Sequence, residues 1–117
     1  MLVKLYVSRP EILSDSQLAD ISLFEFQISH LFGGFTKYEN ATRVWVNYLE
    51  DDEYRDVVDV YEVLIPHELA SRKEVITTFT TLAKEFGQLL GQKCIPFTIL
   101  ESENHFVDID KKEENDA

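Results

Sequence analysis

The chain has 117 residues, a length typical of one domain, and 44% of them are hydrophobic, enough to form a buried core. Its formal net charge is −11, which repels nucleic-acid phosphates and makes direct binding of DNA or RNA unexpected. No run approaches the roughly 20 apolar residues of a membrane-spanning helix, and a single cysteine excludes an internal disulfide. A cytoplasmic protein is therefore expected.

The first two predicted elements are a strand and a helix. Residues 2–7 alternate and are rich in strand-forming side chains. A Ser-x-x-Gln capping box at Ser14 precedes apolar residues spaced three and four apart, which predicts a helix over residues 15–32. Gly33 follows where a helix ends with a residue at positive φ. The predicted core side of this helix comprises Leu18, Ile21, Phe24, Ile28 and Leu31.

The next elements are a hairpin, a second helix and a last strand. Residues 42–49 and 57–65 read as two strands, joined by the polar break Glu50-Asp51-Asp52-Glu53. A second capping box at Ser71 predicts a helix to residue 90. Residues 95–100 read as a fourth strand, and residues 105–109 can add a short fifth. The apolar stripe of the second helix comprises Val75, Phe79, Leu82, Phe86 and Leu89.

The resulting βαββαβ order predicts an α+β, ferredoxin-like sandwich, with a four-stranded antiparallel sheet and both helices on one face. We expect one domain over residues 1–110. Residues 111–117 lack a large apolar side chain and are expected to form an acidic, flexible tail. Because two helices cover one face of the sheet, the other face is left solvated, dimerised or used for binding.

Two places carry candidate binding residues. Gly33 and Gly34 let a ligand approach the backbone, where exposed N–H groups can contact an anion, although a helix stop that needs glycine explains the pair as well. Arg43 and Trp45 share one strand face, and Glu62 lies on the neighbouring strand. Together they can hold a planar polar ligand, or they can form a cross-strand ion pair beside a packed tryptophan.

Several short motifs follow one another over residues 3–100: Ser8-Arg9-Pro10 after the first strand, Gly33-Gly34-Phe35-Thr36, Trp45, Glu62 and Phe86-Gly87-Gln88. In their order and spacing the chain resembles a family of small uncharacterised bacterial ferredoxin-like domains. The strongly acidic balance and the C-terminal segment depart from that pattern. The resemblance implies no chemistry, but it implies that one cluster contains Arg9, Thr36, Trp45, Glu62 and Gln88.

Three functions are consistent with these residues. The first is non-enzymatic binding of a small polar or anionic ligand, such as a metabolite or nucleotide, by a homodimer. Its binding residues would be Arg9, Thr36, Arg43, Trp45, Glu62 and Gln88. The second is an acidic phage or mobile-element protein that inhibits a host enzyme by protein–protein binding or DNA mimicry. Its contact with a basic protein partner would use Glu50, Asp51, Asp52 and Glu53.

The third function is an enzyme with Glu62 as general base, assisted by His30 or Arg9. No second catalytic group is placed by a motif, so we lean away from an enzyme. The sequence contains no Gly-Lys-Ser/Thr phosphate loop and no histidine pair at the spacing of metal ligands. We therefore expect neither a cofactor nor a metal, and no contact with a membrane.

Overall fold

The computed structural model describes residues 1–10, 12–47, 52–92, 94–105 and 107–109, with the backbone alone for residues 45–47 and 52–54. Along these residues the chain forms β1 (Leu2–Ser8), α1 (Asp15–Phe32), β2 (Thr36–Asn47), β3 (Asp52–Leu64), α2 (Arg72–Leu90) and β4 (Phe97–Leu100). The predicted α+β class and βαββαβ order are confirmed.

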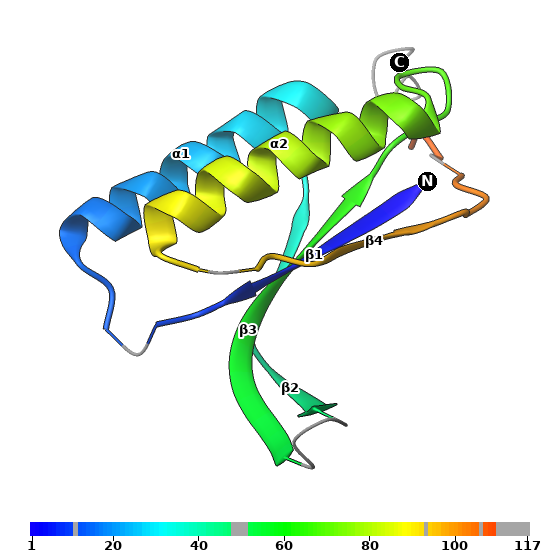
Figure 1. Ribbon diagram of the computed structural model, residues 1–117. Coiled ribbons are helices and arrows are strands. Elements are labelled where there is room, and N and C mark those ends of the chain that lie inside the picture. Colours follow the sequence, from blue (N-terminus) through cyan, green and yellow to red (C-terminus); the bar gives the residue numbers. More distant parts are fainter. Residues whose placement is uncertain (11, 48–51, 93, 106, 110–117) are drawn as a thin grey trace.

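The four strands form one antiparallel sheet in the order β2-β3-β1-β4. β3 lies between β1 and β2, and β1 lies between β3 and β4, so each βαβ unit is split by a strand of the other. Helices α1 and α2 run antiparallel, side by side, over one face of the sheet (Figure 1). The opposite face carries no helix of the described chain.

Both helices begin at the predicted capping boxes. The Ser14 hydroxyl accepts a hydrogen bond from the backbone N–H of Gln17, and the Gln17 side chain accepts one from the Ser14 backbone. Ser71 begins α2 in the same way with Glu74. These bonds satisfy backbone donors that have no partner within the helix.

Alanine substitutions at two glycines, Gly33 and Gly87, are expected to change the stability of the fold in opposite directions. Gly33 ends α1 at φ 85°, where a side chain is strained, whereas Gly87 is buried within α2. A Cβ at position 87 would lie 3.5 Å from the Ile95 Cδ1 atom, an ordinary contact. We expect Gly87→Ala to raise the free energy of unfolding by about 0.5–1 kcal/mol, and Gly33→Ala to lower it by about 1–2 kcal/mol. Urea titration measures both, and shifts of the same sign would contradict the assignment.

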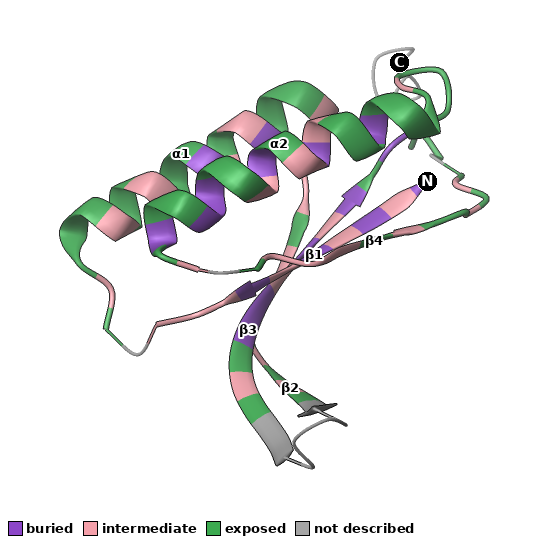
Figure 2. Ribbon diagram, in the orientation of Figure 1, coloured by how far each residue is buried: buried purple, intermediate pink, exposed green. Residues whose placement is uncertain are grey.

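The core lies between the helices and the covered face of the sheet (Figure 2). The Phe24 ring of α1 stacks on the Phe86 ring of α2, with centroids 4.0 Å apart, and meets Tyr61 of β3 edge-on at 5.4 Å. Such aromatic pairs stabilise the fold beyond the area that they bury. The strands complete this core chiefly with Val3, Leu5, Val7, Tyr61 and Val63.

Three leucines predicted for the core lie instead at the surface. Leu18, Leu31 and Leu89 are about half exposed, while Leu90 rather than Leu89 is buried at the end of α2. In α1 the buried residues are Phe24 and Ile28. The prediction was wrong because α1 carries apolar residues on more than one side, so spacings of three and four can be drawn through several sets.

The hairpin strands are longer than predicted. β2 begins at Thr36 rather than at residue 42, and β3 begins at Asp52 rather than at residue 57. Asp52 and Glu53 are therefore strand residues rather than part of the polar break, while residues 50 and 51 lie outside the described part. The first residues of β2 are mostly polar, so their sequence pattern does not predict a strand, and they become one through backbone pairing with β3.

The C-terminal prediction was also wrong in part. Residues 105 and 107–109 form no strand, so the fifth strand is not formed among the described residues. The backbone ladders of the described sheet join β1 to β3, β1 to β4 and β2 to β3, and none of them includes this segment. The predicted tail, residues 111–117, lies outside the described residues.

A β-bulge interrupts β2 between Tyr38 and Ala41. Asn40 has a positive φ of 59°, and its backbone N–H donates to Oδ1 of the buried Asp59 at 3.1 Å. Bulges bend the strand that contains them. Beyond this bend, the outer part of the β2–β3 hairpin extends past the helices (Figure 1).

Candidate functional site

The structure brings four predicted residues together at the uncovered face. Thr36 pairs directly with Glu62 across β2 and β3, and both line a shallow hollow of about 230 Å³ with Gly33 and Gly34. Glu62 is half-buried and forms an ion pair with Lys4 at 3.5 Å. The charged residue that lines the hollow is a carboxylate, and the nearby Lys4 ammonium group is already paired with it. An anion at the two glycines would therefore lie near a negative charge, with no unpaired cation among the lining residues to balance it.

Arg9 lies on the other side of the sheet. Its guanidinium Nη1 is 3.4 Å from Glu39 Oε2, 3.4 Å from Asn40 Oδ1 and 3.6 Å from Asp59 Oδ1. Asp59 and Glu62 are three residues apart in β3, so they point to opposite faces. Arg9 stabilises the bulge and does not meet Glu62.

Arg43 forms the cross-strand ion pair that was one of the two predicted alternatives. Its Nε and Nη2 atoms donate to the two carboxylate oxygens of Asp56 at 3.1 and 2.8 Å, and Ser8 Oγ donates to the same carboxylate. Asp56 is six residues from Glu62 along β3, about 20 Å at roughly 3.3 Å per residue. Trp45 pairs by backbone with Tyr54, still further away, and its side chain lies outside the described part.

The Arg43 pair predicts a pH-dependent contribution to stability. Burial favours a higher pKa for Asp56, but hydrogen bonds from Arg43 and Ser8 and the charge of Arg43 outweigh it and hold the pKa below its usual value of 3.8. A depressed pKa contributes stability above that value and loses it as pH falls through the folded-state pKa. Asp56→Asn should therefore lower the free energy of unfolding by about 0.5–1 kcal/mol near neutral pH, and the difference should vanish in acid.

The control for this prediction is Asp108→Asn, because Asp108 is exposed and has no ion pair within the described residues. Urea unfolding at several pH values measures both variants. A difference between Asp56→Asn and the unchanged protein that persists in acid would show that the carboxylate charge is not its cause.

Gln88 is exposed on α2, in the helical layer, whereas Glu62 and Thr36 lie on the uncovered face. The sheet separates them. The predicted cluster of Arg9, Thr36, Trp45, Glu62 and Gln88 is therefore not formed by the residues whose side chains are described. Of the predicted acidic contact patch, Glu50 and Asp51 lie outside the described residues, and Asp52 and Glu53 are known by backbone alone.

A surface that the sequence reasoning missed lies on the outer side of the two helices. Four large apolar side chains are exposed there: Leu23 (52%), Phe26 (66%), Leu31 (47%) and Leu89 (51%). Two hollows of about 400 and 300 Å³ run along them and share Gln27, Leu82 and Glu85. We call this continuous surface, bounded by Leu23, Phe26, Leu31 and Leu89, the helix groove.

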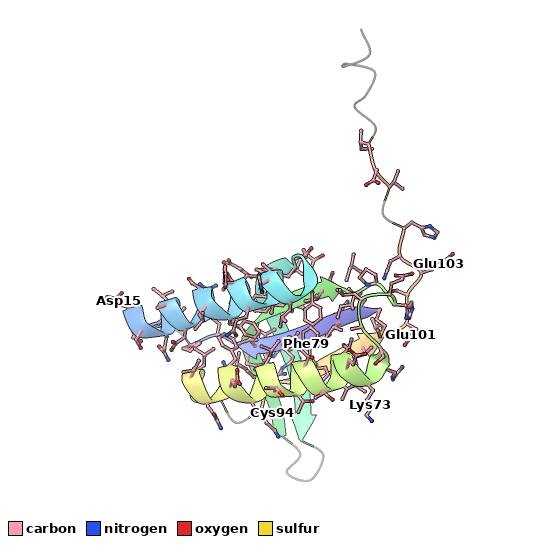
Figure 3. The ribbon with its side chains drawn as sticks, turned by 90° about the horizontal axis from the view of Figure 1, so that it is seen from above. Asp15, Lys73, Phe79, Cys94, Glu101 and Glu103 are labelled. Carbon is pink, nitrogen blue, oxygen red and sulfur yellow. The ribbon has the colours of Figure 1, made fainter. Side chains whose placement is uncertain are left out.

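The floor of the helix groove is the core itself. Phe24, Leu82 and Phe86, which are buried between the helices, line the first hollow from below. Helices α1 and α2 lie side by side (Figure 3), and each contributes residues to both hollows. Exposed apolar residues thus continue directly from the buried ones, and they are not scattered singly over the surface.

The charged groups of the helix groove are acidic. Asp20 and Glu85 line it, from α1 and α2 respectively, and neither has an ion-pair partner within the described residues. His30 lines the second hollow and stacks on Phe26 with ring centroids 6.0 Å apart. No lysine or arginine is among the described residues that line either hollow.

The described residues contain no helix long and apolar enough to cross a bilayer. They also contain no group of three or more histidine, cysteine, aspartate or glutamate side chains arranged to hold a metal ion. No protein-family model matches the sequence, and no curated protein matches it. The resemblance to small bacterial ferredoxin-like domains stays a prediction.

Proposed function

We propose that the chain is a non-enzymatic binding domain whose partner is another protein, bound at the helix groove. The observation that carries this proposal is the continuous row of half-exposed apolar side chains over the α1–α2 seam. Contiguous apolar patches on a protein surface often mark interaction sites, whereas single exposed apolar residues are ordinary. We also propose a cytoplasmic location, on the ground of the single cysteine, Cys94.

Binding of a small anionic ligand has weaker support. The two arginines assigned to it, Arg9 and Arg43, are engaged with carboxylates, and they lie at separate places. Glu62 is engaged with Lys4. A ligand at any one of these places would first have to compete with an existing ion pair. The protein-binding alternative is therefore favoured, with its surface on the helices instead of residues 50–53.

Selection from a displayed library of helical peptides tests the proposal. We expect selected peptides to lose at least about tenfold in affinity when Leu23→Ser and Leu89→Ser are combined, because two apolar anchors are removed. Both residues are about half exposed, so the fold should tolerate the change. Circular dichroism checks that it does.

Two matched controls locate the binding surface. Ile76 is 43% exposed on α2 but lines neither hollow, so Ile76→Ser should leave binding unchanged. Leu64 lies on the uncovered sheet face and is exposed to a similar degree. Peptides that respond to Leu64→Ser and ignore Leu23→Ser would assign binding to the sheet and contradict the proposal, as would a selection that yields no binder.

A further inference from the structure

Resting on the proposed function, we infer that the occupant of the helix groove is an amphipathic helix of another protein, with lysine or arginine flanking its apolar face. Length, shape and charge support this choice. Each is set by residues of α1 and α2 that the structure describes.

The length of the groove matches about two turns of helix. Leu23 and Leu31 are eight residues apart in α1, which is about 12 Å at roughly 1.5 Å per residue. A partner helix that presents apolar side chains at positions i, i+3 or i+4 and i+7 spans about 10.5 Å. Its first anchor would lie between Leu23 and Leu89, and its last would lie near Phe26 and Leu31.

The shape of the groove also favours a helix over an extended strand. The two hollows are lined by residues of both α1 and α2, and a third helix can pack its side-chain ridge between two neighbouring helices. The described walls are helical along their whole length, with backbone groups hydrogen-bonded within α1 and α2. An extended peptide would find no unpaired backbone edge there with which to form a ladder.

The charge of the groove favours a basic partner. Asp20 and Glu85 stand on opposite walls, with Gln27 and Gln88 as neutral polar groups near them. A lysine or arginine on each flank of the bound helix would meet one of these carboxylates. The chain's net charge of −11 adds a long-range attraction that speeds encounter with such a partner.

The same charges disfavour a second copy of the chain as the occupant. A two-fold contact through this surface would bring Asp20 and Glu85 of one copy toward the same residues of the other. Neither carboxylate has an ion-pair partner within the described residues that would neutralise it. A homodimer through the groove is thus the alternative that the experiment must exclude.

Four fluorescein-labelled peptides of about 18 residues, or five turns, test the inference by fluorescence anisotropy. Three share one leucine face and differ on the other face, which is lysine, glutamine or glutamate. The fourth is a scrambled form of the lysine peptide without an apolar face. We expect the leucine–lysine peptide to bind at least about tenfold more tightly than any other, and to weaken as salt is raised.

Charge reversal in the chain provides a matched pair of variants. Asp20→Lys with Glu85→Lys should weaken the leucine–lysine peptide by at least about tenfold. Glu68→Lys with Asp108→Lys changes the net charge by the same amount at exposed positions outside the groove. This second pair should weaken binding of the leucine–lysine peptide far less. Equal weakening by both pairs would overturn the inference, because only the overall charge would then matter.

The remaining outcomes separate the inference from the proposed function. If the lysine and glutamine peptides bind equally and both respond to Leu23→Ser with Leu89→Ser, protein binding at the groove stands and the basic partner is overturned. If the scrambled peptide binds as well as its parent, the amphipathic helix is overturned. If sedimentation shows a dimer that Leu23→Ser with Leu89→Ser dissociates, the occupant is a second copy and the inference fails.

Discussion

Replacing Phe24 with alanine is expected to lower the free energy of unfolding by about 3–5 kcal/mol. Phe24 is only 3% exposed and lies where both helices meet the sheet. Its ring stacks on Phe86 at 4.0 Å between centroids and contacts Tyr61 edge-on. Truncation would remove both ring contacts and leave a cavity beneath the helix groove, which neighbouring side chains can fill only in part.

Phe26→Ala is the control for this prediction. Phe26 lies in the same helix, two residues further on, and is 66% exposed. Its truncation should change the free energy of unfolding by less than about 0.5 kcal/mol. Urea unfolding followed by circular dichroism measures both variants. Comparable losses at the two positions would mean that the outer side of α1 is covered in the folded protein, in conflict with an exposed groove.

Replacing Glu25 with alanine is expected to lower the free energy of unfolding by about 1.5–3 kcal/mol, the range for hydrogen bonds to a charged group. The Tyr61 hydroxyl and the Lys37 ammonium group both donate to Glu25 Oε2 at 2.7 Å. Lys37 also lies 5.3 Å from the centre of the Tyr61 ring. Without Glu25, the largely buried hydroxyl loses its acceptor and Lys37 loses its counter-charge at once.

A double-mutant cycle separates the two bonds. Tyr61→Phe should cost about 1 kcal/mol, less than Glu25→Ala, because Lys37 and Glu25 still pair. The double variant should lose less free energy of unfolding than the two single variants lose in total, because both single substitutions remove the same hydrogen bond. Strict additivity would show that the contact between Tyr61 and Glu25 contributes nothing to stability.

The same network gives an independent spectroscopic readout. Burial, and then the hydrogen bond to Glu25, raise the pKa of Tyr61 above its usual value of 10.0. A raised tyrosine pKa contributes stability below that value and loses it as pH rises toward the folded-state pKa. In Glu25→Ala, the ultraviolet titration of Tyr61 should therefore shift to lower pH, provided that the variant remains folded.

Helix ends were predictable because the signals for them are local. Ser14 and Gln17 are three residues apart, and their mutual hydrogen bonds need nothing from the rest of the chain. Gly33 ends α1 for an equally local reason, its positive φ. The start of β2 was not predictable in this way, because Thr36 and Lys37 become strand residues by pairing with Glu62 and Tyr61 far along the chain.

The candidate site depended on information that single-strand patterns do not hold. Arg43 and Glu62 were placed on adjacent strands correctly, but the register puts Arg43 opposite Asp56. Among the predicted site residues whose side chains are described, only Thr36 pairs with Glu62, and the bulge near Asn40 shifts every later β2–β3 pair by one residue. The helix groove was missed for another reason. An amphipathic helix is expected to have one apolar face, which packs on the core. Leu23 and Phe26 are further apolar residues of α1 that lie outside this core face.

The bulge in β2 also affects whether copies of this chain can aggregate through the edges of their sheets. Strands at the margin of a sheet can recruit further strands and begin aggregation. On one margin, the bulge between Tyr38 and Ala41 breaks the regular row of backbone donors, and Lys37, Glu39 and Arg43 add charge. On the other margin, β4 is only four residues long and follows Pro96. Neither described margin is a good template for amyloid-like growth, so the apolar seam of the helices can stay exposed without inviting sheet extension.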